Sequence, residues 1–172
     1  MIFKWVVLAL SAGVLSGCSP ASEANVVATP SEAAVEQSGV ERHTLSGLQV
    51  IDLTVQSGQT THSFRVELAD TEEAQSRGLM FRNELGDFEG MLFPSDGPEP
   101  RSFWMKNTPL SLDIIFVGTD GRVQNIAANT VPYSTRSVSS AGLTSAVLEL
   151  RGGRAAELGI EPGDKVEYSL SE

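Results

Sequence analysis

Cysteine is almost absent from this chain, since Cys18 is the only one among its 172 residues. One cysteine cannot form an intramolecular disulfide, so the folded part must be stabilised by its core. Histidine is also scarce. His43 and His62 belong to no paired motif, and no HExxH or carboxylate cluster marks a metal site. The sequence therefore predicts no metal and no cofactor.

Basic residues are few as well. There are 12 lysines and arginines against 22 aspartates and glutamates, which gives a formal net charge of −10. Nucleic acid binding needs a basic surface, so we predict no nucleic acid partner. An anionic membrane would repel so acidic a protein. Any attachment to a membrane is therefore expected to come from a lipid anchor alone.

Long hydrophobic runs are missing, and the one short run lies at the N-terminus. Residues 5–15 are largely apolar and follow Lys4, which is typical of a secretory signal peptide and too short for a permanent membrane span. The run ends in LSGC, which resembles the bacterial lipobox, where cleavage precedes an acylated cysteine. We predict a lipoprotein signal peptide over residues 1–17 and lipidation of Cys18; a plain signal peptide with a stray cysteine is the alternative.

Two further segments follow the predicted signal peptide. Residues 18–47 are rich in Ser, Ala, Glu and Pro and have no aromatic residue, which predicts a disordered tether. Residues 48–172 are expected to form one domain. The protein is thus predicted to be exported and anchored in the cell envelope, facing the periplasm, and in the outer membrane if its host has one.

The predicted domain is mainly β. Residues 61–68, THSFRVEL, alternate apolar and polar side chains in the manner of a half-buried strand. Similar patterns predict strands near residues 48–55, 89–93, 103–107, 110–114, 122–128, 145–150 and 165–170. Two short helices are expected near residues 70–77 and 151–159. Such a series of short strands with two short helices favours a small closed or partly closed β-barrel-like domain, because closure removes exposed edges.

Charged residues interrupt an otherwise apolar segment, FWMKNTPLSLDIIF at residues 103–116. We predict a β-hairpin with its turn at Thr108 and Pro109. Strand alternation would then place Trp104, Lys106 and Asp113 on one polar face. Such a face has two interpretations. One is a structural bridge between Lys106 and Asp113; the other is a ligand pocket with Trp104 as a stacking wall.

Several short motifs, in their order along the chain, resemble those of the DUF192 family. They are RGLMFR (77–82), GMLF (90–93), FWMKNT (103–108), LDIIF (112–116), VLEL (147–150) and GIEPGD (159–164). The resemblance implies a compact, β-rich, barrel-like fold, in proteins that are often exported. It implies no reaction, because none is established for the family. One departure from the family pattern is Pro94-Ser95, where family members usually continue with apolar or aromatic residues.

The resemblance also selects candidate site residues. The polar positions characteristic of the family fall on Arg77, Lys106, Asn107, Thr108 and Asp113, and Trp104 accompanies them. We predict that these six residues bind a small polar or anionic ligand. Arg77 has a second interpretation, as a cation that caps a helix C-terminus.

Other functions remain open at this stage. An enzyme, hydrolase-like, could use Lys106 or Asp113 as acid or base in the same pocket. A scaffold for an envelope protein partner needs no pocket at all. Copper(I) held by the methionines at 80, 91 and 105 is a further alternative, although methionine more often fills core gaps.

Overall fold

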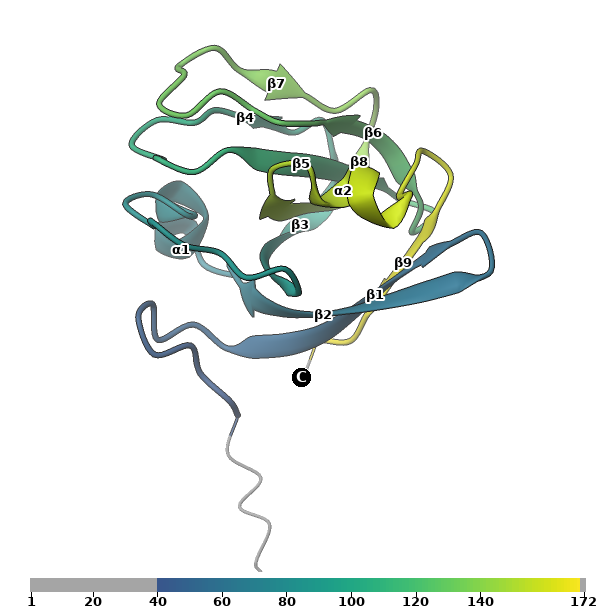
Figure 1. Cartoon of the computed structure of the whole chain (residues 1–172), viewed down its shortest axis with the longest axis horizontal. Coiled ribbons are helices and arrows are strands. Elements are labelled where there is room, and N and C mark those ends of the chain that lie inside the picture. The colour runs from purple at the N-terminus through teal and green to yellow at the C-terminus, as the bar shows by residue number, and fades with distance from the viewer. Residues whose placement is uncertain (1–39, 171–172) are drawn as a thin grey trace, which may run out of the picture. The chain divides into compact units, whose positions relative to one another are not determined.

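The computed structural model describes residues 40–170 (Figure 1). The predicted signal peptide, Cys18 and residues 19–39 of the predicted tether lie outside the described residues. The described elements, in chain order, are β1 (Val50–Ser57), β2 (Thr60–Leu68), α1 (Glu72–Arg77), β3 (Glu89–Glu99), β4 (Ser102–Phe103), β5 (Leu112–Gly118), β6 (Val123–Ala127), β7 (Val138–Ser139), β8 (Thr144–Arg151), α2 (Arg154–Leu158) and β9 (Lys165–Tyr168).

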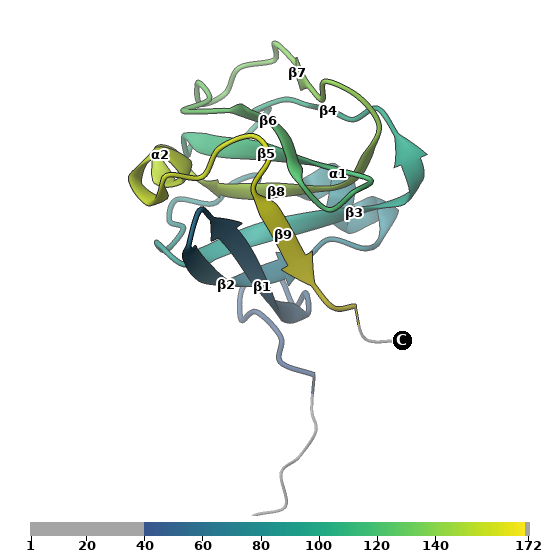
Figure 2. The ribbon, with the colours of Figure 1, turned by 90° about the vertical axis from the view of Figure 1, so that its right-hand side faces the viewer.

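Seven strands form one curled sheet in the order β6-β5-β8-β3-β2-β1-β9. Strands β2 and β3 are parallel and are connected through α1, whereas the other neighbours in the sheet are antiparallel. The two ends of the sheet approach each other at a bridge between Arg122 and Lys165. Figure 2 shows the resulting half-barrel, with β4 and β7 as a small second sheet. The predicted fold class, mainly β with two short helices and partial closure, is confirmed.

The sheet separates two apolar clusters. One fills the concave side and includes Phe64, Leu92 and Leu148. The other covers the opposite face of β3, β5 and β8 with residues such as Phe93 and Ile114. Both faces of β5 are therefore covered, which explains why all seven of its residues are buried.

The hairpin predicted over residues 103–114 is wrong. Strand β4 is only two residues long and pairs with β7, while β5 pairs with β6 and β8. Residues 104–111 form a loop with a turn closed by Thr108 N donating to Met105 O at 3.1 Å. Two-residue hairpin turns favour positive φ at their central residues, which Pro109 cannot adopt. The Thr-Pro pair therefore favours a wider loop.

Regular hydrogen bonding is already present at residues 41–50, which include the last residues of the predicted tether. Residues 41–50 make a turn in which His43 N donates to Leu48 O at 2.8 Å, and Arg42 bridges to Gln49. This turn packs beside β2. Among residues 40–170, neither helix is long or apolar enough to cross a bilayer.

Candidate functional site

A glutamate lies in the apolar face of the sheet. Glu149 sits near the end of β8, opposite Met91 of β3 and Ile114 of β5. It is only 4% exposed, and its carboxyl group has no hydrogen-bond or ion-pair partner among the described residues. Burial raises the pKa of Glu149 to about 8, because an isolated charge is poorly solvated there. The carboxyl group is consequently largely neutral at pH 7.

Glu149 lines a cavity of about 360 Å³ between α1 and the loop that follows β4. Three aromatic residues, Phe93, Phe103 and Trp104, form part of the cavity wall. Arg77 and Thr108 also line the cavity. Apolar walls with a few polar groups are characteristic of small-molecule sites. The cavity combines an aromatic wall with several polar side chains, among them the neutral carboxyl group of Glu149.

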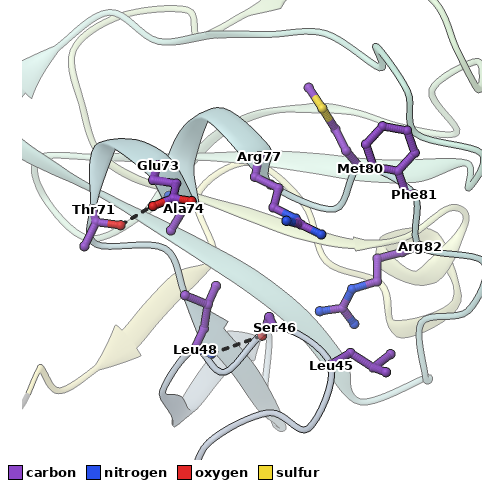
Figure 3. Close-up of a pocket in the computed structure, with 11 residues that line it drawn as sticks. Leu45, Ser46, Leu48, Thr71, Glu73, Ala74, Arg77, Met80, Phe81 and Arg82 are labelled. Carbon is purple, nitrogen blue, oxygen red and sulfur yellow. Dashed lines mark hydrogen bonds between the residues drawn. The ribbon is translucent and has the colours of Figure 1, made fainter.

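Arg77 ends α1 and stands between two cavities. It lines the Glu149 cavity and also a neighbouring cavity of about 430 Å³, where Arg82 and Phe81 are other wall residues. Figure 3 shows the Arg77 guanidinium directed into the neighbouring cavity. Its side chain is exposed and has no hydrogen-bond or ion-pair partner among the described residues. Exposed side chains change rotamer rapidly, so Arg77 is available to an anion in either cavity.

The other arginine of the Glu149 cavity is already engaged. Arg101 donates to Gln75 Oε1 at 3.0 Å and to Glu99 Oε1 at 3.3 Å. Its guanidinium also lies 5.4 Å from the centre of the Phe103 ring. Arg101 therefore organises the wall, and Arg77 is the cation that a ligand could recruit without breaking an existing bond.

Four of the predicted residues gather in the loop after β4. The Lys106 ammonium lies 5.1 Å from the centre of the Trp104 ring, a cation–π contact. Both side chains are exposed. Thr108 is buried, lines the Glu149 cavity and donates its hydroxyl to Lys106 O at 3.2 Å. Asn107 adopts a left-handed φ of 56°, and its side chain contacts the Met80 sulfur.

Asp113 lies elsewhere, within the sheet. Its carboxylate accepts from the backbone N–H groups of Asn129 (2.8 Å), Gly153 (3.0 Å) and Ala155 (2.8 Å). It is fully buried and makes no contact with Lys106. Asp113 thus fixes the start of α2 and the loop after β6. The structure brings Arg77, Trp104 and Thr108 into one cavity wall but does not add Asp113 to it.

Sequence reasoning missed Glu149, although a signal was present. In SAVLEL the neighbours of Glu149 on both strand faces are apolar, which indicates that both faces are covered. A charge in such a strand must be buried, and a buried charge usually marks a pair or a site. Among the described residues, no group of three His, Cys, Asp or Glu side chains is arranged to hold a metal ion.

The chain belongs to the DUF192 family, whose profile, described as an uncharacterized ACR, matches residues 53–168. A crystal structure of a protein of unknown function from Novosphingobium aromaticivorans is 53% identical, with a TM-score of 0.73. It matches 81% of this chain and 99% of its own. A Sinorhizobium meliloti protein described as a transcription regulator is 35% identical over 70% of this chain and 95% of its own, with a TM-score of 0.68. A search of curated proteins gave no match.

These relatives bear on how the domain folds. The match covers 99% of the Novosphingobium chain and 81% of this one, so a chain shorter than the present one forms this fold. Residues 40–172 are therefore a suitable unit for solution experiments.

Proposed function

We propose that this protein is a lipid-anchored domain of the cell envelope that binds a small hydroxylated anion in the Glu149 cavity. The observation that carries the proposal is the buried carboxyl group of Glu149, which has no partner of its own in an open cavity. Buried polar groups are nearly always hydrogen-bonded, so a ligand would supply the missing partner.

The protonation state of Glu149 selects the kind of partner. A neutral carboxyl group both donates and accepts a hydrogen bond, which suits a hydroxyl group. The raised pKa keeps Glu149 neutral without any counter-charge. A cationic ligand would instead favour the ionised carboxylate. A sugar acid or another small hydroxy acid fits the neutral form.

The anionic group of the ligand is assigned to Arg77. Its guanidinium is unpaired and can bind a carboxylate or a phosphate through two parallel hydrogen bonds. Trp104 supplies an apolar wall of the same cavity, against which a ring or carbon chain can pack. Lys106 is held over Trp104 and would add attraction for an anion at the rim.

An enzymatic role is the second candidate, and the burial of Glu149 favours that residue over Lys106 and Asp113 as its acid or base. Asp113 is saturated by three backbone donors, and Lys106 is exposed, so neither has the environment of an acid or base catalyst. Glu149, with a pKa near 8, could exchange a proton with a substrate at neutral pH. Turnover of a bound ligand, lost in Glu149→Gln while binding persists, would identify this role.

A thermal-shift screen of residues 40–172 tests the binding proposal. Sugar acids, sugar phosphates and hydroxy acids are compared with their neutral counterparts. A ligand at about 100 times its dissociation constant adds about 2.7 kcal/mol to the free energy of unfolding. We expect that stabilisation to be lost in Arg77→Gln and reduced in Glu149→Gln, but kept in Lys165→Gln, which removes a cation from β9. Equal stabilisation of all four proteins would place the ligand elsewhere.

A further inference from the structure

Three loops meet beside the Glu149 cavity. They are residues 79–83, 104–111 and 128–137. Backbone hydrogen bonds join them: Phe81 N donates to Asn107 O at 2.8 Å, and Tyr133 N donates to Thr108 O at 3.0 Å. In Figure 1 the segments that carry them, between α1 and β3, between β4 and β5, and before β7, reach the same side of the domain. The three loops therefore form one continuous surface.

Large apolar side chains are exposed on this surface. The described residues include nine exposed large apolar side chains, and four of them belong to these loops. They are Phe81 (67% exposed), Trp104 (47%), Val131 (69%) and Tyr133 (63%). Single exposed apolar residues are ordinary, but a group of them marks an interaction site.

Backbone strain is concentrated in the same loops. All four non-glycine residues with positive φ in the described structure are here: Phe81, Asn107, Asn129 and Tyr133. Asparagine tolerates this conformation, but phenylalanine and tyrosine rarely adopt it. Phe81 has a φ of 63° and Tyr133 a φ of 61°, and both side chains end in solvent. The strained backbone places each aromatic ring in solvent, so packing in the core does not offset the energetic cost of the strain. This points to a role in binding.

The charge of this surface differs from that of the whole protein. Eight of the eleven described lysines and arginines have a hydrogen-bonded or ion-paired side chain. The remaining three are Arg77, Lys106 and Arg136. All three surround Trp104: Arg77 and Arg136 line cavities on which Trp104 also lies, and Lys106 contacts its ring. The stretches 79–83, 104–111 and 128–137 contain no aspartate or glutamate; Glu84 follows directly after the first, and Asp87 in the same loop pairs with Arg151.

We propose that this surface, the loop face of Phe81, Trp104, Val131, Tyr133, Lys106 and Arg136, docks on an anionic phospholipid bilayer. Aromatic side chains settle at the boundary between lipid headgroups and acyl chains, and nearby cations bind anionic headgroups. The acidic net charge predicts repulsion, but the three described cations whose side chains have no hydrogen-bond or ion-pair partner all lie around Trp104. The proposal does not depend on a ligand in the Glu149 cavity.

The predicted lipid anchor is compatible with this orientation. Cys18 precedes Val40 by about 22 residues, which at about 3.5 Å each span up to roughly 75 Å when extended. That length lets the loop face and an acyl group on Cys18 reach the same bilayer. The two attachments would then act together, because an anchored domain meets the surface at a high effective concentration.

Trp104 makes the proposal directly measurable. The other tryptophan, Trp5, lies in the predicted signal peptide, so Trp104 is the only tryptophan in residues 40–172. This unacylated domain is mixed with phosphatidylcholine vesicles with or without phosphatidylglycerol. We expect co-sedimentation and a shift of Trp104 emission to shorter wavelength only with phosphatidylglycerol, and weaker binding at high salt. No sedimentation and unchanged emission with either lipid would overturn the proposal.

Matched variants separate docking from folding. Lys106→Gln and Arg136→Gln should each weaken binding about fivefold, the usual contribution of one cation near an anionic bilayer. Lys165→Gln, on β9, should change it little. Phe81→Gly and Tyr133→Gly remove an exposed ring and relieve the positive φ, so they should lower vesicle binding while the melting temperature stays the same or rises. Vesicle binding unchanged in all four loop-face variants would also overturn the proposal.

Discussion

Glu67 and Glu149 lie on opposite sides of Met91 in adjacent strands, and only Glu67 has a counter-charge. Glu67 pairs in register with Met91 on β2 and β3, and Met91 pairs with Glu149 on β3 and β8. Arg82 donates to both carboxylate oxygens of Glu67 at 2.7 Å, and Ser46 also donates to it. The sheet thus holds three buried acids; Glu67 and Asp113 are satisfied by other described residues, and Glu149 is not.

The unsatisfied acid should make stability depend on pH. The pKa of Glu149 is raised from 4.5 to about 8, so the folded protein keeps a proton that the unfolded chain has released. The free energy of unfolding should therefore fall by about 1.4 kcal/mol per pH unit between about pH 5 and 8. Urea unfolding at several pH values should show this fall in the unmodified domain and not in Glu149→Gln.

An exposed acid provides the control for that experiment. Glu84→Gln removes a carboxylate from the surface and should reproduce the pH dependence of the unmodified domain. Parallel curves for the domain and Glu149→Gln would mean that Glu149 is ionised in the folded protein at neutral pH. The hydroxyl-binding role assigned to it would then be wrong.

The counter-charge of Glu67 should contribute strongly to the stability of the domain. Arg82→Met leaves Glu67 charged and buried, and we expect it to lower the free energy of unfolding by about 3–5 kcal/mol. Lys165→Met breaks an exposed pair with Glu167 and should cost at most about 1 kcal/mol. Adding Glu67→Gln to Arg82→Met should recover part of the loss. No recovery in the double variant would show that Arg82 stabilises through packing alone.

Mutations of Lys106 and Asp113 should have clearly different effects on the free energy of unfolding. Asp113→Ala leaves three backbone N–H groups without their acceptor and should destabilise the domain by about 3 kcal/mol or more. Lys106→Ala removes an exposed side chain and should change stability by less than about 1 kcal/mol. Chemical unfolding measures both. A large loss of stability in Lys106→Ala would instead support a structural role for that lysine.

Cys18 carries the prediction of lipid anchoring. Cys18→Ala should leave the protein in the soluble fraction of its host after a high-salt wash, whereas the unmodified protein stays with the membranes. The wash is needed because docking through the loop face would be weakened by salt and an acyl anchor would not. A variant that still fractionates with membranes in high salt would contradict anchoring at Cys18.

The sequence predicted strand positions well where apolar and polar residues alternate regularly. THSFRVEL became β2 with its expected alternation, and the two short helices formed near residues 72–77 and 154–158. It could not predict how β4 and β5 pair, because that depends on the loop geometry around Pro109 and on β7 and β8, which lie far along the chain.

The candidate site was only partly predictable for the same reason. Trp104, Thr108 and Arg77 were selected through the family resemblance, but the cavity that joins them includes Glu149, which is supplied by β8. Asp113 looked like a partner for Lys106 only within the assumed hairpin. Its actual partners are backbone groups near residues 129 and 153–155, and those contacts depend on tertiary structure.

The contact between the two ends of the sheet, at β6 and β9, affects how readily copies of this protein can pair with one another. Val123 N donates to Asp164 O at 2.9 Å and Val166 N donates to Gly121 O at 2.8 Å, so the two ends of the sheet partly satisfy each other. Backbone groups at a free edge invite pairing with a second molecule. If the protein is anchored through Cys18 as we propose, its copies would meet often on the membrane surface, and this contact shortens the free edge that each copy presents to its neighbours. The fold is therefore suited to dense packing on a surface without strand-to-strand aggregation.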